Sequence, residues 1–96
     1  MTAYVIVDIE VTDPAGYEAY RKLAGPAVAA FEGRFLVRGG ATSTLEGDWH
    51  PARIVVLEFP SVERARAWWA SDAYREARNI RQRTAITDMI VAEGVA

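Results

Sequence analysis

AYVIVDIEVTDPAG, residues 3–16, is the stretch that decides the fold. Apolar side chains alternate along its first nine residues, and this period of two in β-branched residues predicts a strand over residues 3–11. Asp13 and Pro14 then occupy the positions of a helix N-cap and a first helical residue, so the strand is expected to lead directly into a helix. One face of the strand is wholly apolar and must be buried; its members are Ala3, Val5, Val7, Ile9 and Val11.

Alternating apolar patterns, typical of strands, and capped helical patterns continue to the end of the chain. The first helix is predicted to end at Gly33 and to be kinked or split at Gly25-Pro26, because proline cannot donate the helical hydrogen bond. Serines at 61 and 71 are predicted caps, so the second helical segment comes in two pieces. The remaining strands are predicted at residues 34–38, 53–59 and 85–93, and the two helical pieces at 61–70 and about 73–82.

This order of elements, β-α-β-β-α-β, is that of the ferredoxin-like arrangement. We expect a single ferredoxin-like α+β domain over residues 1–96, because a chain of this length has room for one core. Its sheet is expected to be four-stranded and antiparallel, with both helices on one face. Right-handed crossovers are expected to place the first and third strands at the centre of the sheet, running in the same direction.

The other face of the predicted sheet has no helix to cover it, yet half of it is aliphatic. Such a surface is too apolar to stay in water, and an identical face of a second copy would bury it. We therefore expect a homodimer through this open face, with a monomer and a solvated sheet as the alternative. The expected aliphatic members are Ile6, Leu36, Ile54, Val56, Ile86 and Ile90, with Asp8, Glu10, Glu58 and Arg34 at one end and Tyr4 and Arg38 at the other.

Composition argues against several classes of protein. The net charge of −2 argues against a nucleic-acid binder that depends on a basic field, and the lack of cysteine excludes disulfides and thiolate metal sites. No apolar run approaches the ~20 residues of a membrane span, and the N-terminus lacks the pattern of a signal peptide. The one histidine, His50, has no partner at metal-ligand spacing and is expected at the surface. We expect a cytoplasmic protein without metal, cofactor, membrane or nucleic-acid partner.

The connection RGGATSTLEGDWHPAR, residues 38–53, is far longer than a hairpin needs. We expect a folded loop packed over the end of the domain, with its paired glycines allowing a sharp turn and Trp49 anchoring it. Glu46 is expected to pair with Arg38 or Arg53, which flank it. Either that ion pair locks the loop, or one arginine remains free for a ligand carboxylate or enolate oxygen. Arg38 is the expected ligand-binding arginine, because its side chain should point toward the open face.

WWASDAY, residues 68–74, joins the two pieces of the second helical segment. At least one of its two tryptophans must be core. The helix break is expected to open the other, with Ser71 and Tyr74, to a cavity between the helices and the sheet. Arg81 ends a stripe of three arginines at helical spacing, which is usually a solvated face.

Several stretches, in a fixed order, carry a resemblance to a known family: YVIVDIEVTDPAGYEAY, GRFLVRGG, LEGDWHPAR, VVLEFPS, AWWASDAY, Arg81 and IVAEG. On these stretches the chain resembles the bacterial family known as domain of unknown function 1330. The resemblance implies the dimeric α/β-barrel superfamily, in which two such sheets close around one another, and it singles out Arg81 as a residue that can turn inward. The superfamily includes cofactor-free monooxygenases, isomerases, haem-handling proteins and modules without known chemistry, so no single activity is implied.

The sequence departs from the family pattern at three positions. Glu32 stands where glycine is usual, Trp69 where tyrosine is common, and Asn79 where proline often occurs. Of the three, Trp69 bears on the shape of a pocket wall.

Two functions remain open from the sequence, and whether the protein is an enzyme stays undecided. The first is a homodimer that binds or converts a small aromatic or carboxylate-bearing molecule; the second is a non-catalytic dimeric interaction or ligand-sensing module. No catalytic nucleophile is recognisable, since there is no cysteine, no GxSxG elbow and no second histidine. The ligand-binding candidates are Arg38, Glu46, Trp49, Arg53, Ser71, Tyr74 and Arg81.

Overall fold

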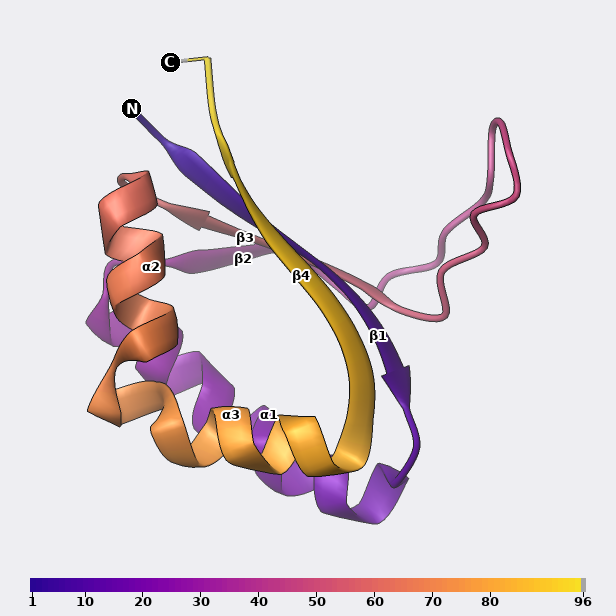
Figure 1. Cartoon of the computed structure of the whole chain (residues 1–96), viewed down its shortest axis with the longest axis horizontal. Coiled ribbons are helices and arrows are strands. Elements are labelled where there is room, and N and C mark those ends of the chain that lie inside the picture. The colour runs from indigo at the N-terminus through magenta and orange to yellow at the C-terminus, as the bar shows by residue number, and fades with distance from the viewer. Residues whose placement is uncertain (96) are drawn as a thin grey trace.

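The computed structural model describes residues 1–95 and has the predicted order of elements (Figure 1). Every predicted strand and helix is present, with bounds that differ from the prediction by at most a few residues. Of the helices in residues 1–95, none combines the length and hydropathy that a membrane crossing requires. The elements are β1 (Ala3–Val11), α1 (Pro14–Ala30), β2 (Arg34–Arg38), β3 (Ile54–Phe59), α2 (Val62–Ala70), α3 (Asp72–Thr84) and β4 (Ala85–Glu93).

Side-chain caps fix where the helices begin. Asp13 accepts a hydrogen bond from the Gly16 amide at 3.1 Å, and Ser71 accepts one from the Tyr74 amide at 3.1 Å. The extended backbone of Ser71 separates α2 from α3, as predicted. The expected split of α1 is wrong, because α1 continues through Pro26. Pro26 lies on the exposed side of the helix, where water can satisfy the carbonyl that loses its partner.

The sheet has the strand order β2-β3-β1-β4, and every neighbouring pair is antiparallel. The first and third strands are central, as expected, but the expectation that they run in the same direction is wrong. Each crossover skips one strand: β1 to β2 passes over β3, and β3 to β4 passes over β1. The parallel pairs are therefore never adjacent. All three helices cover the same face of the sheet (Figure 1).

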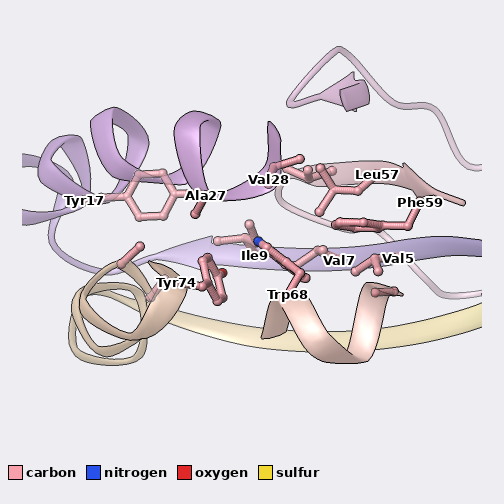
Figure 2. Packing of buried hydrophobic residues seen from close by; sticks show 14 residues of the cluster. Val5, Val7, Ile9, Tyr17, Ala27, Val28, Leu57, Phe59, Trp68 and Tyr74 are labelled. Carbon is pink, nitrogen blue, oxygen red and sulfur yellow. The ribbon is translucent and has the colours of Figure 1, made fainter. Parts of the chain in front are cut away.

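The core lies between that face and the helices. Val5, Val7 and Ile9 of β1 are all at most 3% exposed. At the centre of the core, the Trp68 ring packs between two other rings, with its centroid 4.3 Å from that of Tyr74 and 5.2 Å from that of Phe59 (Figure 2). Burying these large rings contributes substantially to the apolar stabilisation of the domain.

A bulge in β2 changes the face on which that strand ends. Phe35 pairs with Leu57, but Val37 pairs with Val56, so Leu36 is the extra residue. Paired residues share a face, so Arg38 lies on the helical side with its partner Val55. The expectation that Arg38 points toward the open face is therefore wrong, because a one-residue insertion reverses the alternation. Val37, and not Leu36 as expected, is therefore the residue of β2 that pairs with Val56 on the open face.

The open face is apolar across its middle, as predicted. Ile6 pairs with Val56 on one side and Ile90 on the other, and Ile90 is 60% exposed. The expected distribution of charge is wrong, because β1 and β3 run in opposite directions. Arg34, Glu58 and Tyr4 share one end, while Asp8, Glu10 and Asp88 gather toward the other.

One position between α1 and β2 has an unfavourable backbone. Glu32 has φ +63°, a left-handed conformation that disfavours any residue with a Cβ. This explains why glycine is usual there in the family that the sequence resembles.

We expect Glu32→Gly to stabilise the protein by about 1 kcal/mol and to raise Tm by about 4–8 °C. The substitution also removes the exposed ion pair with Arg64, which contributes little. Thermal unfolding should be compared with that of Glu32→Ala, which removes the ion pair and keeps a Cβ. If the two variants melt together, backbone strain at this position is not significant.

Candidate functional site

A groove beside β4 forms a hollow on the helical side of the sheet. It has a volume of about 570 Å³, within the range of sites for small organic ligands. Side chains from α2, α3 and β4 line it, so its walls belong to rigid elements. They include Ala65, Trp68, Trp69, Arg81, Thr87 and Met89.

Two arginines line this β4 groove: Arg66, which is exposed, and Arg81, which is buried. Only 4% of Arg81 is exposed, so its side chain turns inward from α3 while Arg75 and Arg78 of the same stripe do not. Its Nε donates to the hydroxyl of Tyr74 at 3.3 Å. Within residues 1–95, no Asp or Glu forms an ion pair with it, and no hydrogen bond uses its two terminal nitrogens. The terminal nitrogens are thus available to a molecule in the groove.

A chain of hydrogen bonds leads from Arg81 deeper into the protein. The hydroxyls of Tyr74 and Tyr20 lie 2.9 Å apart, and Tyr74 is fully buried. Burial raises the pKa of Tyr20 far above its usual value, and Tyr74 beside it adds to this rise. Tyr20 therefore remains a neutral phenol. The chain connects the β4 groove with a second space under α1.

This second space, the α1 cavity, lies between α1 and the sheet and has a volume of about 20 Å³. Trp68 and Met89 line both the α1 cavity and the β4 groove, so they form the partition between the two. No acidic side chain lines the α1 cavity. Its polar residues are Tyr17, Tyr20, Arg21, Arg38, Arg53 and Trp68.

Arg53 reaches the α1 cavity because Gly39 leaves room for it. A Cβ added at Gly39 would lie 2.4 Å from the Arg53 guanidinium carbon, and Gly39 has φ +76°. The first glycine of the pair thus provides both a turn and space for a side chain. Burial raises the pKa of Tyr17, and the Arg53 guanidinium beside it opposes this rise.

Arg38 lies at the exposed side of the same cavity. One of its terminal nitrogens donates to the Arg21 carbonyl at 3.2 Å, and its guanidinium carbon stands 4.0 Å from the centre of the Phe35 ring. Within residues 1–95, neither Arg38 nor Arg53 forms an ion pair.

The long loop is not packed over the domain, contrary to expectation; it projects from the end of the sheet (Figure 1). Residues 40–50 are all exposed, including Glu46, so the expected ion pair of Glu46 with Arg38 or Arg53 is absent. The loop has few large apolar residues to bury, and Leu45 at its tip is 98% exposed. Trp49 is 60% exposed, but its indole nitrogen donates to Asp8 at 2.9 Å, which tethers the loop to β1.

The remaining candidates have clear positions. Ser71 is a helix cap and does not line the β4 groove. His50 is exposed, and its Nδ1 lies 2.9 Å from the Thr44 hydroxyl. Trp69 is 44% exposed and lines the groove, while Trp68 is core. Among residues 1–95 there is no cluster of His, Asp or Glu that could hold a metal ion.

Tyr20, Thr87 and Met89 were not among the predicted site residues. Tyr20 belongs to the apolar stripe of α1, which the sequence identifies only as core. Thr87 and Met89 alternate with open-face residues along β4, and that alternation indicates the helical side but no site.

Comparisons with known proteins agree with this fold. The structure is similar to RPA0582 from Rhodopseudomonas palustris, a protein of unknown function, with TM-score 0.78 and 21% identity over 99% of this chain and 83% of that one. It also resembles a dimeric ferredoxin-like protein of unknown function from Jannaschia sp. CCS1, with TM-score 0.72 and 11% identity over 98% of this chain and 100% of that one.

A more distant likeness is to SnoaB, a cofactor-independent oxygenase from Streptomyces nogalater, with TM-score 0.58 and 12% identity over 99% of this chain and 94% of that one. No curated protein sequence shows significant similarity to the chain. The profile of Domain of unknown function (DUF1330) matches residues 2–95, nearly the whole chain. The chain therefore belongs to the DUF1330 family, with a ferredoxin-like α+β fold.

Proposed function

We propose that the protein is a homodimer that binds a small aromatic carboxylate in the β4 groove. One observation carries the ligand part: Arg81 is 4% exposed, lines a hollow of about 570 Å³ and forms no ion pair within residues 1–95. The ligand carboxylate accepts from the terminal nitrogens of Arg81, and its ring lies against the tryptophan wall.

Electrostatics favours an anionic ligand. A buried guanidinium without an acidic partner costs free energy, because it has lost water and gained no opposite charge. A carboxylate that accepts two parallel hydrogen bonds offsets this cost, and arginine has the planar geometry for it. The hydrogen bond from Arg81 Nε to the Tyr74 hydroxyl orients the guanidinium, and this sets the direction of its terminal nitrogens.

The groove lining favours binding over turnover. It contains no Asp, Glu or His, so no side chain there is suited to accept a proton near neutral pH. SnoaB shares the fold and is a cofactor-independent oxygenase, but a likeness of fold does not transfer an activity. The proposal is therefore a ligand-binding protein.

Benzoate and its neutral analogue benzamide test the role of Arg81. At about ten times its Kd, benzoate should raise the Tm of the wild type by about 4 °C or more, and benzamide should not. Arg81→Met should lose the benzoate response, because the cation is gone. Without ligand, this variant should melt about 4 °C above the wild type, since it no longer buries an unpaired charge.

Arg75→Met is the matched control, because Arg75 is an exposed arginine of the same helix that pairs with Asp72. It should keep the benzoate response. An equal response to benzoate in Arg81→Met and the wild type would exclude Arg81 as the anion-binding group.

The homodimer part of the proposal is supported by the open face. Ile86 and Ile90 are 63% and 60% exposed in the protomer and adjoin an apolar row that crosses the sheet. Packing against the same face of a second copy would bury them. The similar Jannaschia protein is dimeric, which agrees with this proposal.

Ile90→Arg should convert the dimer to a monomer at micromolar concentration, because dimerisation would then bury an unpaired charge. Sedimentation equilibrium gives the mass, and circular dichroism shows whether the protomer stays folded. Leu23→Arg, which places the same charge on the helical side, should remain dimeric. A wild type that sediments as a monomer would refute the homodimer.

A further inference from the structure

We propose that the α1 cavity is a binding site for a small inorganic anion of halide size, separate from the β4 groove. At about 20 Å³ the cavity has room for one occupant about as large as a water molecule. This excludes an organic ligand and leaves a single water or a monatomic anion as the occupant. The chemistry of the lining decides between the two.

Two buried donors at this cavity have no partner. The Nε of Arg53 and the indole nitrogen of Trp68 are both inaccessible to solvent and form no hydrogen bond within residues 1–95. Figure 2 shows the indole nitrogen on the side of Trp68 that faces β1 and Ile9, and Ile9 also lines the cavity. Buried donors normally have acceptors, so both indicate an occupant that accepts hydrogen bonds.

The hydrogen-bond chain ends at this cavity. Arg81 can only donate, so the Tyr74 oxygen accepts from it. The Tyr74 and Tyr20 hydroxyls lie 2.9 Å apart, and either can donate to the other. Tyr20 lines the cavity, so its hydroxyl is a polar group within reach of an occupant.

Charge favours an anion over a water molecule. Arg21, Arg38 and Arg53 all line the cavity, no acidic side chain does, and only Arg21 forms an ion pair within residues 1–95. Arg21 and Arg38 are exposed to solvent, so the charge that the occupant must offset is that of Arg53. A water molecule would leave this charge uncompensated and would bring two protons that need acceptors. A halide accepts from both unpaired donors and carries the compensating charge.

Chloride and bromide are the probes, with gluconate as the anion too large to enter. At equal ionic strength and protein concentration, the wild type should melt about 4 °C or more higher in chloride or bromide than in gluconate. Arg53→Met should lose this difference, and Arg53→Lys should recover part of it. Arg75→Met, which changes an exposed arginine, should behave as the wild type. An equal difference in wild type and Arg53→Met would overturn the proposal.

A second measurement avoids any dependence on the folding of Arg53→Met. In the variant Trp49→Phe/Trp69→Phe, Trp68 is the one remaining tryptophan, and it is 1% exposed. Bromide bound beside its indole nitrogen should quench its fluorescence along a saturable curve that chloride displaces. Absent or strictly linear quenching would overturn the proposal. Benzoate is too large for the α1 cavity, so failure here and failure of benzoate binding are distinguishable.

Discussion

The alternation of side chains along β1 is the constraint on which the rest of the structure depends. β1 pairs with β3 on one side and with β4 on the other, so its register assigns nearly every sheet residue to a face. Val5, Val7 and Ile9 must meet the helices, and this places Asp8 and Ile6 on the open side. The helical face then gathers the aromatic core, while the open face keeps an aliphatic centre with charged ends.

The unusual property of this core is the charge at its borders. Arg81 of α3 and Arg53, which precedes β3, extend their side chains toward the layer between the helices and the sheet, and Trp68 lies between their two spaces. A small domain is only marginally stable, so positive charge that no acidic residue offsets is a substantial penalty. We interpret that penalty as the signature of occupants: an organic anion at the groove and an inorganic one in the cavity.

The fold was predictable because it depends on local patterns and on one topological rule. The alternation of β1, the caps at Asp13 and Ser71, and the β-α-β-β-α-β order were sufficient for the architecture. The site was less predictable, because it depends on details that a single sequence does not reveal. The bulge at Leu36 places the Arg38 side chain on the helical side, and the sequence RFLVR does not by itself indicate an extra residue. Conversely, Tyr74 and Arg81, both candidates from the sequence, are in hydrogen-bond contact.

The projecting loop is joined to the sheet at its base and is otherwise separate from the core. Its backbone is joined to the sheet where the Gly39 amide donates to the Ile54 carbonyl at 2.9 Å, and beyond that point the exposed residues share little with the core. Segments of this kind accept added or deleted residues at low cost to stability. The loop tip near Leu45 is accordingly a natural position for grafting an epitope, a fluorophore or a second domain, with the scaffold behind it left intact.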